Sequence, residues 1–429
     1  MNILLIGGGG REHTMAWKLN ESPLCDKLFI LPGNAGTATL GVNLPISITN
    51  FEAIGEAVLK YEINMVVVGP EEPLVKGIYD FFKQDEGLKK LLFIGPSANA
   101  ALLEGSKAFA KAFMNRHGVP TASYKQFSKN EFDEGCDYIK QQPLPIVLKA
   151  DGLAAGKGVI ICNNYIEALS EFELMLLHSK FGRAGERVVV EAFLTGIEMS
   201  VFILTDGNSF VLLPEAKDYK RVGEGETGLN TGGMGAISPV PFFNEALKEK
   251  IVQRIIQPTL DGLRKEKLDY KGFIFFGLMI SDGEPWVIEY NCRMGDPETE
   301  VVLPRLKNDF VELLKATADG TLHKIDVKTD FRAASTVVAV SGGYPGKYKS
   351  GIPIYGAEGG MQENALLFHS GTKMEGEQLL TNGGRVLAMT AFGSSVTDAT
   401  KHAMDKLAKV SFEGMYFRRD IGFEFSDSL

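Results

Sequence analysis

Residues 146–161 read IVLKADGLAAGKGVII, which is two short apolar runs joined by a loop of glycine, alanine and lysine. The runs are rich in β-branched residues and predict two β-strands. Because the loop carries no bulky side chain, its backbone amides and Lys157 can fold over a triphosphate, while Lys149 at the strand end supplies a fixed positive charge. A P-loop is excluded, because its GxxxxGK(S/T) opens a helix rather than a strand. A plain flexible hairpin is the alternative interpretation. The loop glycines that carry the prediction are Gly152, Gly156 and Gly158.

The composition around this stretch is that of a globular protein with more than one core. At 429 residues the chain predicts several packed subdomains around a common cleft. Hydrophobic residues make up 45% and charged residues 23%, which argues against long disorder. The formal net charge of -9 disfavours nucleic acid and an anionic membrane surface as partners. Glycine, at 48 residues, falls in clusters, as it does where backbone approaches phosphates.

Cysteine spacing and terminal hydropathy bear on the compartment. The four cysteines form no CxxC pair, so neither a zinc site nor a disulfide framework is indicated, and a reducing cytoplasm fits best. No secretory signal is visible at the amino terminus, and no apolar segment approaches the length that a bilayer requires. We therefore expect a cytoplasmic protein whose partners are small molecules.

The pattern along the chain divides it into three parts. In residues 1–103, short apolar runs alternate with helix-length polar stretches, which predicts βαβ units on a parallel sheet. Residues 104–327 mix strands with long glycine loops, and residues 328–429 read as a small α+β module that begins with a strand at 334–340. The expected strands of the first part are residues 3–6, 27–31, 65–68 and 91–94.

The first strand runs into a glycine turn, ILLIGGGGREH at residues 3–13. Such a turn can hold a phosphate at a helix amino terminus. The dinucleotide fingerprint GxGxxG fails, because Glu12 or His13 stands at its third glycine, so an NAD enzyme is disfavoured. Arg11 can instead clamp a monophosphate through two parallel hydrogen bonds. The alternative is a tight turn with a solvated Arg11 and a helix-capping His13.

Two further segments suit a nucleotide. Ser106 is a good helix N-cap and places Lys107 in the first helical turn. A positive charge there is unfavourable to the helix dipole. Lys107 is therefore expected either to bind an anion or to be a solvated side chain. Glu191 ends one strand and Glu198 opens the next, and two carboxylates flanking a free backbone edge suit an adenine amino group and ribose hydroxyls. Two exposed acids at strand ends are the alternative.

A metal candidate lies in residues 286–298, WVIEYNCRMGDPE. Glu289 and Asn291 are two residues apart, so on a strand both point the same way, with about 6 to 7 Å between their Cα atoms. Two oxygen ligands on one face, completed by phosphate and water, are typical of magnesium sites. Arg293 follows on that face if the strand continues. An ordinary polar strand end is the alternative.

Together these motifs carry a resemblance that covers nearly the whole chain. The order GGGGREH, GPEEPLVKGI, LEGSKAFAKAF, LKADGLAAGKGV, NTGGMGAISP, EYNCRMGDPETE, FHSGTK, TNGGRVL and FRRDIG resembles the phosphoribosylamine–glycine ligase family of the ATP-grasp superfamily. The resemblance implies α/β and α+β architecture: a preATP-grasp amino-terminal domain, an ATP-grasp domain with a mobile lid at about residues 121–190, and a carboxy-terminal domain that closes the substrate cleft.

The resemblance also assigns site residues, position by position. The implied ATP contacts are Lys107, Lys149, Gly152, Gly156, Lys157, Gly158, Glu191, Phe193, Leu194 and Glu198, with Glu289 and Asn291 as ligands of Mg²⁺ or Mn²⁺. The residues implied to face the substrates are Gly9, Gly10, Arg11, Glu12, His13, Glu71, Asp218, Lys220, Asn230, Thr231, Gly232, Gly233, Met234, Arg293, Gly295 and Asp296. One departure is Lys217-Asp218-Tyr219-Lys220, where the family often has Gln-Asp-His-Lys, so a role for Tyr219 is open.

The implied activity is the ATP-dependent ligation of glycine to 5-phosphoribosylamine in purine biosynthesis, through glycyl phosphate. Lys149 is expected to offset phosphate charge, Arg293 to stabilise the tetrahedral oxyanion, and Asp218 to act beside them. A monomer or homodimer is expected. Two alternatives are another ATP-grasp carboxylate–amine ligase and a non-catalytic nucleotide-binding regulatory protein.

Overall fold

Parallel strands build the amino-terminal part of the molecule. The computed structural model describes residues 1–154, 158–178, 180–358, 360–362 and 364–426. The strands are β1 (Asn2–Gly7), β2 (Lys27–Pro32), β3 (Val42–Asn43), β4 (Met65–Val68) and β5 (Leu92–Pro96). They lie in the order β5–β4–β1–β2–β3 and all pair in parallel. The βαβ arrangement expected from the apolar runs is confirmed.

Helices connect these strands. They are α1 (Gly10–Asn20), α2 (Phe51–Lys60), α3 (Glu71–Val75), α4 (Ile78–Gln84) and α5 (Ala98–Gly105), with the 3₁₀ turn η1 (Thr37–Thr39). Local sequence sets where they begin: the Asn50 side chain accepts from Ala53 N–H at the start of α2, and the Ser97 side chain accepts from Ala100 N–H at the start of α5.

The same sheet continues into the central part through antiparallel strands. These are β10 (Ile197–Thr205), β11 (Phe210–Leu212), β16 (Tyr270–Ser281) and β17 (Glu284–Asn291). Strand β16 pairs with β5, which joins the two parts in one nine-stranded sheet. The covering helices are α9 (Glu245–Ile251), the π-helical η4 (Val252–Ile256), α10 (Gln257–Lys265), α11 (Thr299–Arg305) and α12 (Phe310–Asp319), followed by the turn η5 (Leu322–Lys324).

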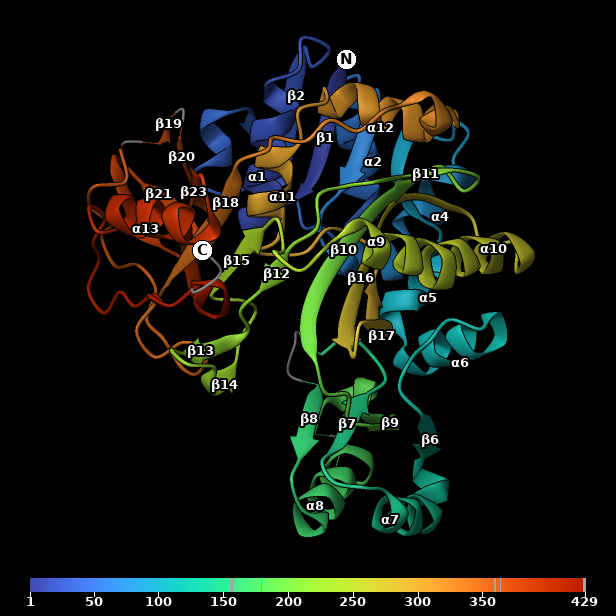
Figure 1. Ribbon diagram of the computed structural model, residues 1–429. Coiled ribbons are helices and arrows are strands. Elements are labelled where there is room, and N and C mark those ends of the chain that lie inside the picture. Colours follow the sequence, from blue (N-terminus) through green and yellow to red (C-terminus); the bar gives the residue numbers. More distant parts are fainter. Residues whose placement is uncertain (155–157, 179, 359, 363, 427–429) are drawn as a thin grey trace.

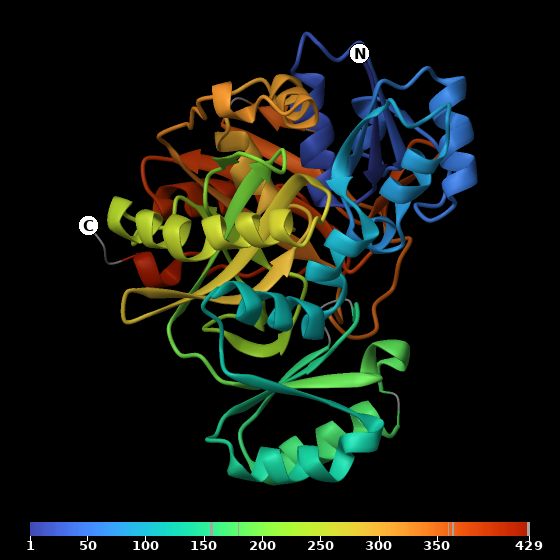
Figure 2. The ribbon, with the colours of Figure 1, turned by 90° about the vertical axis from the view of Figure 1, so that its right-hand side faces the viewer.

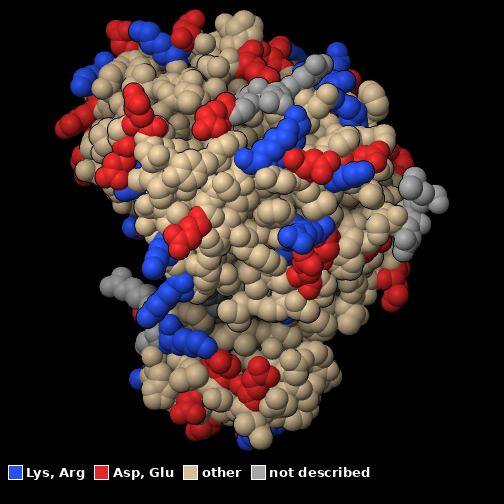
Figure 3. Space-filling model, turned by 90° about the vertical axis from the view of Figure 1, so that its left-hand side faces the viewer, with Lys and Arg blue, Asp and Glu red and all other residues tan. Residues whose placement is uncertain are grey.

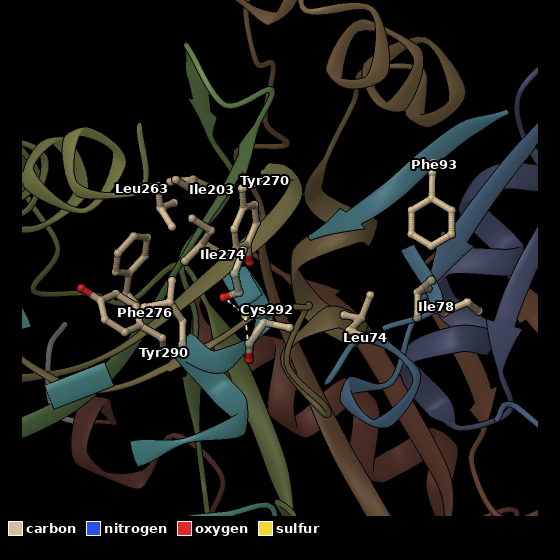
Figure 4. Close-up of a cluster of buried hydrophobic side chains, with 14 of the residues drawn as sticks. Leu74, Ile78, Phe93, Ile203, Leu263, Tyr270, Ile274, Phe276, Tyr290 and Cys292 are labelled. Carbon is tan, nitrogen blue, oxygen red and sulfur yellow. Dashed lines mark hydrogen bonds between the residues drawn. The ribbon is translucent and has the colours of Figure 1, made fainter. Parts of the chain in front are cut away.

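Aromatic side chains fill the core where β16 meets β17. Figure 4 shows Tyr270, Ile274 and Phe276 from β16 close to Tyr290 and Cys292. The rings of Phe276 and Tyr290 pack edge to face with centroids 5.5 Å apart. This rigid layer lies directly behind the strand that carries the predicted metal ligands.

The segment predicted as a lid forms a lobe of its own, and we call this lobe the lid (Figures 1 and 2). After α6 (Lys107–His117) come β6 (Tyr124–Ser128), η2 (Lys129–Glu131), α7 (Phe132–Gln141), β7 (Ile146–Ala150), β8 (Val159–Cys162), α8 (Tyr165–Leu176), η3 (Gly182–Gly185) and β9 (Arg187–Ala192). The four strands form an antiparallel sheet in the order β6–β9–β7–β8, with α7 and α8 on the face turned away from the body. The two strands predicted in residues 146–161 are present, and the lid has a small core of its own.

The carboxy-terminal part is built on a six-stranded sheet, at the left of Figure 1. Its order is β12 (Lys217–Asp218), β15 (Gly235–Ser238), β18 (Ala333–Val340), β23 (Arg385–Gly393), β20 (Ala365–His369) and β19 (Met361–Gln362), with α13 (Val396–Leu407) against it. Two hairpins, β13 (Arg221–Gly223) with β14 (Thr227–Asn230) and β21 (Thr372–Glu375) with β22 (Gln378–Thr381), and the turn η6 (Phe423–Phe425) complete it. Strands β12 and β15 come from the central part of the sequence, so this sheet crosses the division predicted at residues 327 and 328, which stays a prediction.

Membrane insertion by a helix finds no support in the fold. Within the described ranges, no helix is both long and apolar enough to cross a bilayer.

Candidate active site

Two hollows lie next to one another beneath the lid and beside the amino-terminal strands. We call the first the lid cavity; it has a volume of about 160 Å³ and is lined by Glu71, Leu103, Glu104, Lys107, Ala110, Lys111, Met114, Lys149, Leu153, Ala154, Gly158, Val159, Glu191, Ile288, Glu289, Tyr290, Asn291 and Arg293. We call the second the N-terminal hollow; it has a volume of about 660 Å³ and is lined by Gly7, Gly8, Gly9, Arg11, Glu12, Pro32, Gly33, Asn34, Ser47, Ile48, Pro70, Asp296, Ser370, Gly371, Thr372, Asn382 and Arg385. Figure 3 shows the space between the lid and the body, with Lys and Arg side chains at its edge.

Two buried lysines meet one carboxylate in the lid cavity. Lys149 Nζ lies 3.0 Å and Lys111 Nζ 2.9 Å from Glu191 Oε2, and all three side chains are nearly inaccessible to solvent. Burial lowers the pKa of Lys111 to about 8. The other carboxylate oxygen, Glu191 Oε1, is buried and has no hydrogen-bond partner among the residues that the structure describes. A free acceptor of this kind is costly unless a ligand donates to it.

Lys111 also lines this cavity, although the sequence motifs did not single it out. It follows Lys107 by one helical turn, so both lie on the same face of α6. That spacing in LEGSKAFAKAF is the signal that points to it. Lys107 lines the cavity rather than extending into solvent, and its Nζ donates to Gly152 O at 3.3 Å. Burial lowers the pKa of Lys107. Ser106 caps the helix as predicted, accepting from Phe109 N–H.

A β-bulge in β17 shapes the wall that carries the metal candidates. Gly277 pairs with Glu289 but Leu278 pairs with Val287, so Ile288 is the extra residue. Its carbonyl accepts from Lys149 Nζ at 3.1 Å. Glu289 and Asn291 both line the lid cavity. A carboxylate and an amide oxygen side by side are hard oxygen donors of the kind that magnesium prefers, and further ligands would have to come from phosphate and water. No cluster of three His, Cys, Asp or Glu side chains with metal-binding geometry occurs among the residues that the structure describes.

Arg293 lines the lid cavity and is linked to the N-terminal hollow through Met294, whose carbonyl accepts from Arg293 at 3.1 Å and from Arg11, which lines that hollow, at 3.2 Å. The strand ends at Asn291, so Arg293 lies beyond it, and its guanidinium pairs with Glu104 at 2.9 Å and with Glu71 at 3.3 Å. Glu104 also accepts from Cys292 N–H, and burial, partly offset by Arg293, raises the pKa of Glu104 to about 7. The guanidinium is thereby held at the wall of the lid cavity.

The glycine turn before α1 does not match the alternative interpretation, in which Arg11 is solvated and His13 caps the helix. Arg11 is 7% exposed and pairs with Glu12 at 2.6 Å. Glu12, not His13, caps α1, because its Oε2 accepts from Gly9 N–H. His13 Nδ1 accepts from His369 N–H at 2.7 Å, and burial together with the nearby His369 lowers the pKa of His13 well below its usual value. His13 therefore ties α1 to the carboxy-terminal sheet.

Residues from the far end of the chain close the N-terminal hollow. Arg385 Nη1 donates to Gly232 O at 2.7 Å and to Asp296 O at 2.8 Å, and its Nη2 lies 3.0 Å from Asp296 Oδ1. The motifs FHSGTK and TNGGRVL carried the resemblance but no residue of theirs was assigned to the site. The lining residues missed in this way are Ser370, Gly371, Thr372, Asn382 and Arg385, and Asn34, outside both motifs, was missed as well.

Asp218 and Lys220 lie on the short strand β12 and its extension. Lys220 Nζ is 2.8 Å from Glu198 and 4.0 Å from Asp218. Burial raises the pKa of Asp218, although Lys220 acts in the opposite direction. Thr231 donates to Lys220 O from both its N–H and its hydroxyl. These two bonds hold the loop that follows β14 against this strand.

The structure places the predicted site residues in three groups. Those that line the lid cavity are Glu71, Lys107, Lys149, Gly158, Glu191, Glu289, Asn291 and Arg293, and those that line the N-terminal hollow are Gly9, Arg11, Glu12 and Asp296. Those that line neither are Gly10, His13, Gly152, Phe193, Leu194, Glu198, Asp218, Lys220, Asn230, Thr231, Gly232, Gly233, Met234 and Gly295. Gly156 and Lys157 lie outside the described residues.

Known protein families match the chain in three consecutive segments. The matching families are the N domain of phosphoribosylglycinamide synthetase over residues 1–104, its ATP-grasp (A) domain over 105–299, and its C domain over 334–424. A phosphoribosylamine–glycine ligase of Haemophilus influenzae is 45% identical over 426 residues, which is 99% of this chain and 98% of the relative. One of Chlorobaculum tepidum is 45% identical over 431 residues, which is 98% of this chain and 99% of the relative.

Solved structures agree with these matches. The crystal structure of a phosphoribosylamine–glycine ligase from Thermotoga maritima superposes with a TM-score of 0.82 at 34% identity and covers 98% of this chain and 100% of its own. A biotin carboxylase domain of Hydrogenobacter thermophilus, solved with MgADP and bicarbonate, has a TM-score of 0.72 at 18% identity and covers 97% of this chain and 92% of its own. The second likeness concerns the fold alone.

Proposed function

This chain belongs to the phosphoribosylglycinamide synthetase family, and from that premise we propose how its residues divide the reaction among them. The reaction is the ATP-dependent ligation of glycine to 5-phosphoribosylamine, which yields glycinamide ribonucleotide, ADP and phosphate in purine biosynthesis. The observation that supports the division is the carbonyl of Met294, which accepts from Arg293 of the lysine-lined cavity at 3.1 Å and from Arg11 of the second hollow at 3.2 Å. We place the reaction in the cytoplasm, in a monomer or homodimer.

ATP is assigned to the lid cavity. The unpartnered Glu191 Oε1 is the acceptor for the adenine amino group or a ribose hydroxyl. Lys107 and Lys149 face the phosphates, and Lys149 then exchanges its ion pair with Glu191 for one with the triphosphate. Lys111 stays on Glu191 and keeps that carboxylate compensated. Phe193, Leu194 and Glu198 remain assigned to the nucleotide on the resemblance.

Glu289 and Asn291 are the residues that would hold a divalent metal. Their oxygen donor set fits Mg²⁺ or Mn²⁺, and both line the cavity that the lysines share. Bound there, the metal supplies neutralisation of charge on the phosphates.

The chemistry proceeds in two steps. A carboxylate oxygen of glycine attacks the γ-phosphorus of ATP and displaces ADP, which gives glycyl phosphate. The amine of phosphoribosylamine then attacks the acyl carbon, loses a proton and expels phosphate. Arg293 stands where it can stabilise the tetrahedral oxyanion, and Lys149 offsets charge that builds on the transferring phosphoryl group. Asp218 and Lys220 lie beside Glu198, where they can orient glycine.

Phosphoribosylamine is assigned to the N-terminal hollow. Arg11 and Arg385 bring positive charge to its walls, and Ser370 and Thr372 bring hydroxyl donors. These groups suit a sugar monophosphate. Placed there, the amine would face Arg293 and the acyl phosphate across the boundary of the two hollows.

The first test is ADP formation with ATP, magnesium, glycine, ribose 5-phosphate and ammonia, the last two of which generate phosphoribosylamine. We expect omission of any one of them to abolish turnover. ADP formation with a different carboxylate or amine in place of these would identify another ATP-grasp ligase, and ATP binding without turnover would identify a regulatory protein.

The second test follows oxygen atoms. Glycine labelled with heavy oxygen in its carboxylate should transfer one label to inorganic phosphate in each turnover and keep the other in the product amide. Phosphate released without label would rule out attack of the carboxylate on ATP.

A further inference from the structure

We propose that Glu424, in the carboxy-terminal turn η6, is a positioning residue for the ligation. Through Tyr219 and Lys217 it holds the short strand that carries Asp218 and Lys220. The inference rests on the function proposed above, because it concerns the placement of two residues of that site. It assigns a part in the reaction to a segment that lies outside both hollows.

The strand in question presents alternate side chains to opposite sides. Lys217 and Tyr219 point one way and are 8% and 0% exposed, respectively. Asp218 and Lys220 point the other way, where Lys220 reaches Glu198 at 2.8 Å. Whatever fixes Tyr219 therefore fixes the backbone on both sides of it, and with it Asp218 and Lys220, which line neither hollow but which the proposed function assigns to glycine.

Both carboxylate oxygens of Glu424 are engaged on this strand. Tyr219 Oη donates to Glu424 Oε2 at 2.9 Å, and Lys217 Nζ pairs with Glu424 Oε1 at 2.9 Å. The same Lys217 Nζ lies 4.1 Å from the centroid of the Tyr219 ring. Burial, with the Glu424 charge, raises the pKa of Tyr219, so its hydroxyl remains a proton donor. One side chain thus restrains both Lys217 and Tyr219, which lie on the same face of β12 and its extension.

The turn that carries Glu424 is itself anchored. Arg418 is 0% exposed and pairs with Asp420 at 2.8 Å and with Glu226 of the β13–β14 hairpin at 2.6 Å. Its guanidinium also lies 5.4 Å from the centroid of the Tyr219 ring. Figure 1 shows this last part of the chain beside β12 and β15. Glu424 therefore acts from a fixed platform and not from a loose terminus.

The backbone of the strand offers a direct readout. Tyr219 N–H donates to Gly235 O at 3.0 Å, and Met234 N–H donates to Tyr219 O at 2.7 Å. If Glu424 holds the strand, its removal should speed hydrogen exchange at these two amides. That measurement does not depend on catalysis.

The experiment compares Glu424→Ala, Tyr219→Phe and the double variant with Glu413→Ala, an exposed acid of the same module. We expect each single substitution to lower kcat by roughly tenfold, since small misplacements of orienting groups cost this much or more. The double variant should lose no more than the worse single variant, because both remove one contact. KM for phosphoribosylamine should stay within about twofold, since neither Glu424 nor Tyr219 lines the N-terminal hollow.

Three results would overturn the proposal: unchanged kcat in Glu424→Ala, effects that multiply in the double variant, or the same loss in Glu413→Ala. Unchanged hydrogen exchange at Tyr219 and Met234 would overturn it as well. An unmodified protein that forms no ADP with glycine and phosphoribosylamine would instead overturn the proposed function, and hydrogen exchange would still decide whether Glu424 holds the strand.

Discussion

Glu191 is shared between two lysines that have different tasks. Lys149 lies beside the bulge carbonyl of Ile288 in the cavity where we propose that ATP binds, whereas Lys111 also donates to Thr121 Oγ1 at 2.7 Å. A buried carboxylate that loses one ammonium partner needs the other. This arrangement lets Lys149 turn to ATP without leaving a buried charge uncompensated.

Replacement of Lys111 by Met should therefore weaken ATP binding. Lys149 would have to remain on Glu191, and we expect the dissociation constant of ATP to rise by on the order of tenfold or more. Titration calorimetry measures it. Lys125→Met is the control and should bind ATP normally. It removes a surface lysine of the lid strand β6 that pairs with Glu134 of α7. Equal affinity in both variants would contradict this role.

The metal assignment rests on Glu289. Glu289→Ala should raise the magnesium concentration needed for half-maximal activity by roughly tenfold or more and lower kcat, while circular dichroism shows a folded protein. Glu284→Ala, at the other end of the same strand and paired with Lys250 at the surface, should change neither quantity. An unaltered magnesium dependence in Glu289→Ala would sink the assignment.

Glu298 predicts a pH dependence of stability. Burial, reinforced by Asp218, raises its pKa from 4.5 to about 7, so the folded state holds this proton more tightly than the unfolded state. The resulting contribution to stability is complete below about pH 4.5 and is lost as the pH rises through about 7. The unfolding free energy of the unmodified protein should therefore fall between about pH 5 and about pH 8. In Glu298→Gln this fall should be smaller than in the unmodified protein by about 1 to 3 kcal/mol. Urea denaturation measures it, and a fall equal to that of the unmodified protein would contradict the prediction.

At the scale of elements, the lid hairpin and the bulged strand meet across the lid cavity. Strand β7 brings Lys149 to the Ile288 carbonyl, and the bulge turns that carbonyl toward it. The loop between β7 and β8 begins at Asp151, whose carboxylate accepts from Ser106 Oγ and from Ala108 N–H at the start of α6. These contacts fix the β7–β8 hairpin of the lid relative to helix α6 and to strand β17.

The glycine loop itself can be tested at Gly158. A Cβ there would lie 2.7 Å from the Ala154 Cβ, so Gly158→Ala should displace the loop. A lid that seals poorly exposes glycyl phosphate to water, and we expect the ATP consumed per product formed to rise above one to one. Gly158→Ala combined with Ala154→Gly removes the clash and should restore the ratio. A slower reaction that keeps the one-to-one ratio would mean that the loop does not exclude water.

At the scale of the whole molecule, the amino-terminal and carboxy-terminal parts of the chain meet at the N-terminal hollow. His13 and Asn34 from the amino-terminal part bond to the backbone of His369, and Arg385 bonds to Asp296 and Gly232 of the central part. The carboxy-terminal part therefore forms one wall of the N-terminal hollow, where we propose that phosphoribosylamine binds.

Arg385→Ala should open that wall. We expect KM for phosphoribosylamine to rise by on the order of 10- to 100-fold, because a guanidinium that orders two loops is lost, with KM for ATP unchanged. Steady-state kinetics with each substrate varied in turn measures both constants. Arg254→Ala, which removes a surface arginine paired with Glu284, should alter neither. A parallel rise in both constants would indicate general damage.

Features that depend on neighbours in sequence could be predicted from sequence alone. The parallel strands, the hairpin at 146–161, the Ser106 cap and the two-residue spacing of Glu289 and Asn291 follow from side-chain periodicity, from backbone freedom at glycine and from local hydrogen bonding. The motif order likewise identified the family, since so many short patterns in one order are specific.

Features that depend on contacts between distant residues were decided only by the tertiary structure. The pairing of β15 with β18, the contact of Lys149 with the Ile288 carbonyl, the sharing of Glu191 by Lys111 and Lys149, and the closure of the hollow by Arg385 each join segments far apart in the chain. Sequence patterns report which face of an element is apolar, but not which other element covers it. Packing in three dimensions makes that choice, because burial and hydrogen bonding are satisfied by the whole molecule at once.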